Sequence, residues 1–160
     1  MIQPAAGSES LSHVLDKLAQ VLNERRVAYA LIGGLGVSMR GSMRTTQDVD
    51  LLINIPQLQL PGVFEALAAA GFQIDVLEAI RVWNRDGLLD FNSGAIRVDW
   101  LKPVVPAFGR ILERAKAEQV GDQMIRVADA EGLILMKLIA FRNRDQDDIK
   151  SILAANPASL

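Results

Sequence analysis

The chain of 160 residues contains no cysteine. This absence excludes disulfide bonds, zinc–thiolate sites and thiol nucleophiles, and it fits a reducing compartment. An excess of positive charge is also lacking, because the formal net charge is −2 and the sequence pI is about 5.4. The chain as a whole therefore has no strongly basic surface for nucleic acid. Arginine greatly outnumbers lysine, which suits phosphate recognition but is also common at ordinary protein surfaces.

Long hydrophobic runs are absent too. The longest apolar stretch extends from Gly132 to Phe141 and contains Lys137, whereas a membrane-spanning helix needs about 20 apolar residues. Residues 1–7 lack the basic start and apolar run of a signal peptide. We therefore expect a soluble, cytoplasmic protein without membrane contacts. The length and the apolar content predict a single domain over residues 1–160, with 1–9 as a loose lead-in.

The spacing of apolar residues predicts the secondary structure. Helical spacing predicts helices over 10–26, 35–40, 63–70, 107–117, 129–142 and 145–155. Short apolar runs predict strands over 28–32, 48–53 and 124–127, and a hairpin with strands 88–91 and 95–101 around a turn at 92–94. The stretch 72–85 is ambiguous, and we interpret it as a strand followed by a loop. Strands come early and helices return late, so we expect an α+β fold in which helices pack on one sheet.

Two aspartates in the predicted strand 48–53 carry the clearest chemical signal. Side chains alternate along a strand, so Asp48 and Asp50 share one face while Val49 points to the other. At a separation of about 4 Å and an effective dielectric near 20, two carboxylates repel by on the order of 4 kcal/mol. Such a pair needs a cation or a shared proton, and oxygen ligands without nearby histidine or cysteine favour Mg²⁺ or Mn²⁺. The alternative is a solvated strand edge or a helix cap.

A glycine pair lies upstream of these aspartates. The predicted strand 28–32 runs into Gly33 and Gly34, and glycine lets backbone N–H groups approach a phosphate closely. The helix expected to follow adds its positive amino end. Arg44 and Thr45 precede the aspartates, and they either contact phosphate or shape the loop. A nucleoside triphosphate with its metal is the natural ligand of a phosphate loop followed by a carboxylate pair.

A third aspartate lies in the hairpin. Ile96, Val98 and Trp100 share one face of the strand, and Arg97 and Asp99 share the other. Aspartate is disfavoured within strands and needs a reason to be there. Beside the first pair, Asp99 would complete a three-carboxylate site for two metal ions. The alternative is an exposed strand residue that pairs with Arg97.

Lys137 is the only charge between Gly132 and Phe141. A helix places it on a face that should be buried, and a buried ammonium needs a carboxylate or phosphate partner. A nucleotide contact, a salt bridge to an internal aspartate and a side chain extending to the surface all remain open. Asp145 and Asp148 begin the last helix, where acidic residues ordinarily stabilise the amino end.

Together these features resemble a known superfamily. A Gly-Gly turn, a short helix, a strand with Asp-x-Asp and a later strand with a third aspartate are similar to the nucleotidyltransferases related to DNA polymerase beta. Residues 133–149 resemble the C-terminal motif of AbiEii-type minimal nucleotidyltransferases, which occur in toxin–antitoxin and abortive-infection systems. The resemblance spans roughly residues 31–149. It implies a mixed sheet with antiparallel edges flanked by helices, magnesium and a nucleoside triphosphate.

The resemblance also assigns roles to residues. It makes Asp48, Asp50 and Asp99 the catalytic metal-binding carboxylates. It places Gly33 and Gly34 in the phosphate loop, and it places Lys137 near the triphosphate. Many members have Gly-Ser in this loop, with the serine touching a phosphate, whereas this chain has glycine at the second position.

The implied reaction transfers a nucleoside monophosphate from a nucleoside triphosphate to a hydroxyl. The acceptor remains open among RNA, a protein side chain and a small molecule. The chain is short for the family, so a homodimer or a partner protein could supply further surface. A non-catalytic nucleotide-binding or regulatory module that acts with a partner protein is the main alternative function. An α+β domain with accidental motif matches is a third.

Overall fold

The computed structural model describes residues 9–41, 47–140 and 143–157. Its strands within these ranges form one sheet in the order β3-β4-β2-β1-β6-β5. Their bounds are β1 Ala28–Ile32, β2 Asp48–Asn54, β3 Leu88–Ser93, β4 Ile96–Leu101, β5 Lys116–Val120 and β6 Gln123–Val127. Strand β2 pairs with β4 in parallel, as β1 does with β6, while the pairs β1–β2, β3–β4 and β5–β6 are antiparallel. The expected mixed sheet with antiparallel edges is confirmed.

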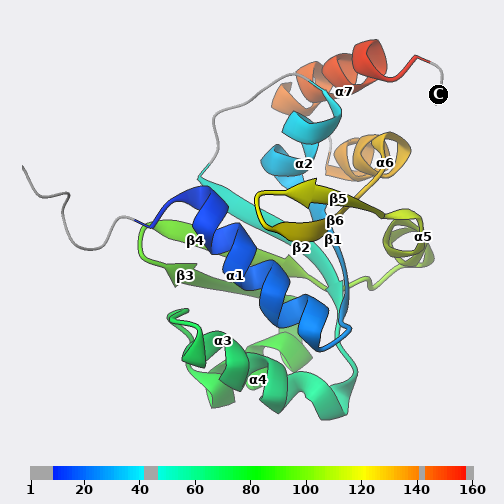
Figure 1. Cartoon of the computed structure of the whole chain (residues 1–160). Helices are drawn as coiled ribbons and strands as arrows, with labels where there is room; N and C mark the ends of the chain where they lie inside the picture. The colour runs from blue at the N-terminus through cyan, green and yellow to red at the C-terminus, as the bar shows by residue number, and fades with distance from the viewer. Residues whose placement is uncertain (1–8, 42–46, 141–142, 158–160) are drawn as a thin grey trace, which may run out of the picture.

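Helices cover both faces of this sheet (Figure 1). They are α1 Leu11–Glu24, α2 Gly33–Arg40, α3 Leu60–Ala69, α4 Val76–Asp86, α5 Pro106–Arg114, α6 Ala130–Ala140 and α7 Asn143–Ala155, with a short 3₁₀ turn η1 at Gln57–Gln59. One apolar cluster joins the sheet to α1, α3 and α4, and a second joins it to α2, α5, α6 and α7. The fold is therefore α+β, with a helical layer on each side. None of the helices in the described ranges is long and apolar enough to cross a membrane.

The larger cluster contains the big aromatic side chains. Trp83 and Trp100 are each 1% exposed, and their rings meet edge to face with centroids 6.2 Å apart. Phe64 stacks on Trp100 at 5.9 Å. The burial of such large rings contributes much of the hydrophobic free energy that stabilises a core. Both tryptophans are thus core residues.

The interpretation of 72–85 as a strand followed by a loop is wrong from residue 76 on, because 76–86 form helix α4, whereas Gln73 makes an isolated antiparallel bridge with Asn92 of β3. The side chain of Asp75 accepts a hydrogen bond from the backbone N–H of Glu78 at 3.0 Å, which caps the helix. Gly87 ends it in a left-handed conformation with φ 65°. The buried residues Ala79 and Trp83 are four positions apart, which is helical spacing. The Asp75 cap and the burial of Ala79 and Trp83 favour a helix more strongly than the β-branched and aromatic residues of this segment favour a strand.

Two further boundaries differ from the expectation. The helix predicted over 107–117 ends at Arg114, because Lys116 begins β5 and pairs with Val127 of β6. The hairpin turn falls at 94–95 rather than 92–94, since Asn92 and Ser93 still belong to the strand ladder. By contrast, the strand expected over 28–32 is confirmed at both ends. The expected helices at 10–26 and 145–155 are confirmed as α1 and α7, within a few residues at each end.

Candidate active site

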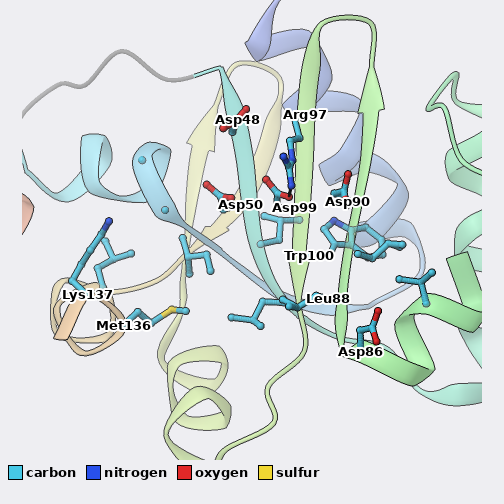
Figure 2. Close-up of a pocket in the computed structure, with 18 residues that line it drawn as sticks. Asp48, Asp50, Asp86, Leu88, Asp90, Arg97, Asp99, Trp100, Met136 and Lys137 are labelled. Carbon is cyan, nitrogen blue, oxygen red and sulfur yellow. Dashed lines mark hydrogen bonds and ion pairs between the residues drawn. The ribbon is translucent and has the colours of Figure 1, made fainter. Parts of the chain in front are cut away.

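The central parallel strand pair brings the three predicted carboxylates to one face of the sheet. In the β2–β4 register Asp50 lies opposite Asp99, and Asp48 lies opposite Arg97. Figure 2 shows these side chains on neighbouring strands above a common recess. The residues that alternate with them are buried in the core on the opposite face: Val49, Leu51, Val98 and Trp100.

A fourth carboxylate, which the sequence interpretation missed, continues this row. Asp90 of β3 lies opposite Asp99 in the antiparallel β3–β4 register, so Asp50, Asp99 and Asp90 occupy three adjacent strands. The alternation of Leu89 and Phe91, both buried, indicates which way Asp90 points. Its position beside Asp99, however, depends on the hairpin register, which the turn fixes.

Asp50 lies in an unfavourable electrostatic environment. The pKa of its carboxyl is raised from an ordinary 3.8 to about 6, mainly by burial and then by the negative charges of Asp99 and Asp48. Lys137 and Arg97 act in the opposite direction without cancelling this effect. A raised carboxyl pKa means that the ionised form lacks sufficient positive charge around it. The positive charges of the described residues thus do not compensate the negative charge of an ionised Asp50.

Arg97 bonds to one of these carboxylates directly. Its Nε and Nη2 both lie 2.9 Å from Oδ1 of Asp99, which raises the pKa of Arg97, with the charges of Asp90 and Asp48 adding to the effect. Within the described ranges, no three acidic or histidine side chains converge closely enough to enclose a metal ion. Asp99 is therefore engaged with Arg97 rather than drawn together with Asp48 and Asp50.

The predicted phosphate loop lies beside Asp50. Gly33 and Gly34 are the first residues of α2, rather than a loop before a later helix, and both line the same pocket as the aspartates. Gly33 has φ +64°, and an added Cβ would lie 2.7 Å from Cγ of Asp50. The N-cap residue Ile32 has no polar side chain to bond the first N–H groups of the helix. The predicted contacts of Arg44 and Thr45 lie outside the described residues.

Lys137 faces this pocket from α6 but is already paired. Its Nζ donates to Oδ1 of Asp145 at 2.9 Å and lies 3.0 Å from Oδ2 of Asp148. All three side chains are buried. The salt bridge to internal aspartates, one of the open alternatives, is thus present, and the two acids of α7 do more than favour its amino end. An ammonium has three N–H groups, so the described pairs leave one for a ligand in the pocket.

These side chains surround a single open cavity of about 870 Å³. Its lining includes the carboxylate row, Arg97, the start of α2 and Lys137. The rest of the lining is mainly apolar with one further acid, from α4, β3, β4 and α6: Val82, Asp86, Leu88, Leu101 and Met136. Figure 2 shows Met136 and Lys137 on one side and Asp86 on the opposite side of this recess. Its volume accommodates a ligand larger than a metal ion.

Comparison with known families agrees with this geometry. The family described as "Nucleotidyl transferase of unknown function (DUF2204)" matches residues 11–159. This range contains every described residue of the candidate site. No curated protein matches the sequence.

Solved structures of similar fold include a nucleotidyltransferase-like protein and an antibiotic adenylyltransferase. An antigenic nucleotidyltransferase-like protein from Paracoccidioides brasiliensis matches with a TM-score of 0.59 and 17% identity, covering 96% of this chain and 78% of that one. The lincosamide antibiotic adenylyltransferase LnuA, with lincomycin bound, matches at 0.60 and 15%, covering 91% and 96%. ANT(2″)-Ia in complex with adenylyl-2″-tobramycin matches at 0.55 and 11%, covering 89% and 87%. At these identities the likeness establishes the fold alone.

Proposed function

Because the chain belongs to the nucleotidyl transferase family that matches residues 11–159, we propose that it transfers a nucleoside monophosphate from a nucleoside triphosphate to a hydroxyl of a small acceptor, with Mg²⁺ or Mn²⁺ as cofactor. The observation that carries this proposal is the register that places Asp50 opposite Asp99, with Asp48 on the same face. The oxygen of the acceptor bonds to the α-phosphorus, the bond from that phosphorus to the pyrophosphate oxygen breaks, and the hydroxyl proton passes to a carboxylate or to water.

The donor atoms of the site suit a hard divalent cation. Carboxylate oxygens from Asp48, Asp50 and Asp99 are the ligands that Mg²⁺ and Mn²⁺ prefer. The pKa of Asp50 near 6 supports the same assignment, because a cation at this carboxylate would relieve the crowding of negative charge. When bound, such an ion polarises the phosphate and neutralises developing charge. Asp99 has to turn from Arg97 to join the other two carboxylates.

The chain's own groups can hold the triphosphate. The uncapped amino end of α2 presents the N–H groups of Gly33 and Gly34, and helix amino ends bind phosphate. Lys137 supports the phosphates from the facing wall through its remaining N–H. Asp145 and Asp148 keep its ammonium in position. Asp99 aligns the acceptor hydroxyl with the α-phosphorus.

The side of the cavity formed by β3 and α4 favours a small acceptor with amino groups. Asp90 and Asp86 lie there together with apolar side chains such as Leu88, and both oxygens of Asp86 also accept hydrogen bonds from Arg85. An acidic wall attracts a cationic, hydroxylated molecule and repels the phosphates of RNA. The net charge of −2 supports the same choice. LnuA and ANT(2″)-Ia are bound to lincomycin and adenylyl-2″-tobramycin in their structures, which makes hydroxylated antibiotics suitable first probes.

A toxin–antitoxin role would require a different acceptor, an RNA end or a protein side chain. The acidic wall weighs against RNA in particular. A cytoplasmic location, where ATP and Mg²⁺ are abundant, fits the absence of cysteine. Incubation with radiolabelled ATP and separate acceptor pools of small amines, RNA and protein tests this choice. Label that appears in the RNA or protein pool and not among the small amines would replace the proposed acceptor class.

The reaction itself is tested first by binding and then by turnover. Calorimetric titration with Mg²⁺ and each of four non-hydrolysable nucleoside triphosphates should show metal-dependent binding to the wild type. Asp48→Ala and Asp50→Ala should lose this binding and all transfer, whereas Asp122→Ala, a change at an exposed residue before β6, should retain both. Wild-type-like transfer by Asp48→Ala and Asp50→Ala would refute the site. Nucleotide binding without turnover on any acceptor would instead support a non-catalytic module.

A further inference from the structure

We propose that Arg97 is a removable counterion, which holds Asp99 before the metal–nucleotide complex binds and then leaves it for the triphosphate. This inference rests on the proposed function, because it concerns the same carboxylates. It assigns Arg97 a positioning role through Asp99, in addition to a contact with the substrate phosphates. The sequence interpretation considered Arg97 only as a structural partner of Asp99.

The geometry of the ion pair limits what Asp99 can do. Arg97 and Asp99 are two residues apart on β4 and share its face, and both bonding nitrogens converge on the same oxygen, Oδ1, at 2.9 Å. A divalent ion binds a carboxylate oxygen at about 2.1 Å. Because the guanidinium and the metal are both cations, each weakens the binding of the other at this oxygen. Arg97 therefore competes with a metal ion for Oδ1 of Asp99.

The position of Arg97 explains why it pairs with Asp99 in the first place. In the sheet register, Arg97 lies opposite Asp48 of β2 and opposite Asn92 of β3. Asp90 is two residues from Asn92 on β3 and therefore points to the same face. The guanidinium thus lies among carboxylates from three strands, and Figure 2 shows it folded back along β4 toward Asp99. Lys137, the other cation near this row among the described residues, bonds to Asp145 and Asp148. Arg97 is accordingly placed to substitute for a metal ion while none is bound.

Arg97 can also leave at little cost. Its side chain is 54% exposed, against 33% for Asp99, and exposed ion pairs contribute little to stability. Its long side chain can swing without moving the strand, whereas β4 is fixed by the burial of Val98 and Trp100. A planar guanidinium matches two oxygens of a phosphate. The freed group would remain inside the same cavity as the start of α2.

Nuclear magnetic resonance of arginine Nε–Hε groups tests the movement directly. The Arg97 resonance, assigned by its loss in Arg97→Lys, should show a hydrogen-bonded Hε in metal-free protein. It should shift when Mg²⁺ and a non-hydrolysable ATP analogue are added. Arg114 is a matched internal control, since its Nε bonds Oδ2 of Asp129 at 2.9 Å and its side chain is 56% exposed. An Arg97 resonance that stays unchanged at saturation, like that of Arg114, would overturn the inference.

Ligand binding by variants provides a second test, in which the Kd for the metal ion and the Kd for the metal–nucleotide complex should change in opposite directions. Removing the competing cation in Arg97→Gln should lower the Kd for Mn²⁺ alone, followed by electron paramagnetic resonance, by roughly two- to fivefold. The same variant should raise the Kd for the Mg²⁺–ATP analogue by about tenfold, because the phosphates lose a bidentate partner. Arg97→Lys, which keeps the charge without the planar fork, should lie between. Arg114→Gln should change neither constant.

The outcomes separate this inference from the function on which it rests. If Mg²⁺ and nucleotide bind but both constants of Arg97→Gln equal those of the wild type, Arg97 is not a removable counterion, and the transferase assignment stands. If both constants change in the same direction, Arg97 acts only as a surface charge, and the inference also fails. If the wild type binds no nucleotide with or without metal, the proposed function and the inference fail together.

Discussion

Gly33 and Asp50 share one small space at the side of the cavity: the carboxyl group of Asp50 lies where a side chain on Gly33 would stand. An added Cβ would come within 2.7 Å of Cγ and 2.8 Å of Cβ of Asp50, and the φ of Gly33 is +64°. The first residue of α2 therefore has to be glycine for two independent reasons. One is backbone conformation, and the other is the room that the carboxylate needs.

Gly33→Ala should therefore damage both the fold and the site. The left-handed conformation costs about 1–2 kcal/mol for alanine, and the clash displaces Asp50, so transfer should fall at least tenfold beyond any loss of folded protein. Urea denaturation and turnover per folded molecule measure the two effects. Gly109→Ala is the control, since nothing lies within 4 Å of an added Cβ there. Full activity of Gly33→Ala would show that Asp50 tolerates displacement.

Asp50→Asn should stabilise the metal-free protein while abolishing transfer. The carboxyl has a pKa of about 6 when folded and an ordinary 3.8 otherwise, so between these values the folded state binds more protons than the unfolded state. The free energy of unfolding of the wild type should consequently fall as pH rises from 4 to 6. The amide removes this penalty and should add roughly 1–3 kcal/mol at pH 7.5, with little effect near pH 4.

Urea denaturation in EDTA at pH 4.5 and pH 7.5 measures this difference. Asp122→Asn, at an exposed position, should show no comparable gain at either pH. Added Mg²⁺ should raise the stability of the wild type and leave Asp50→Asn unchanged. A variant less stable than the wild type at pH 7.5 would mean that the charge of Asp50 is already compensated without metal.

Lys137→Met should be strongly destabilising. Asp145 and Asp148 are buried and share the Lys137 ammonium, and removing one member of a buried ion group costs roughly 3–5 kcal/mol. The double variant Lys137→Met/Asp145→Asn removes one of the charges left behind and should recover part of this loss. Urea denaturation of both variants measures the recovery. Equal instability of the single and double variants would contradict a shared ion group.

Asp90→Asn should affect the acceptor without affecting the nucleotide. Asp90 lies in the row opposite Asp99 but on the edge strand β3, on the side of the cavity away from Asp50. Calorimetry should show unchanged Mg²⁺–nucleotide binding, while the KM for an amine-bearing acceptor rises about tenfold, as expected when one charge-assisted hydrogen bond is lost. A neutral hydroxylated acceptor should show a smaller change. Weakened nucleotide binding would instead make Asp90 a member of the metal site.

Much of the site could be predicted because it depends on alternation within single strands. The pattern of apolar and acidic residues in 48–53 and 96–101 determines that Asp48, Asp50 and Asp99 all point away from the core. The roles of these residues remain predictions. The placement of Asp90 was missed because it depends on which strands pair, and this pairing follows from the whole sheet rather than from local sequence.

The other missed features depend mainly on tertiary contacts as well. In 72–85 the β-branched and aromatic residues favour a strand, yet the Asp75 cap and the burial of Trp83 determine a helix. At Lys116 the local sequence favours a helix, yet pairing with β6 determines a strand. For Lys137 the sequence predicts the need for a partner but cannot choose between phosphate and aspartate. That choice depends on how α7 packs against α6.

The order of strands in the sheet also has an evolutionary consequence. Asp50 and Asp99 belong to strands β2 and β4, each flanked by strands on both sides, and they alternate with residues that are at most 1% exposed. The far wall of the cavity belongs instead to the edge strand β3 and to the exposed side of α4. Substitutions there can alter the proposed acceptor site while the core and the carboxylates proposed to bind metal stay intact. Proteins with this fold can thus change their acceptor through substitutions on β3 and α4, while selection for the reaction acts on the residues of β2 and β4.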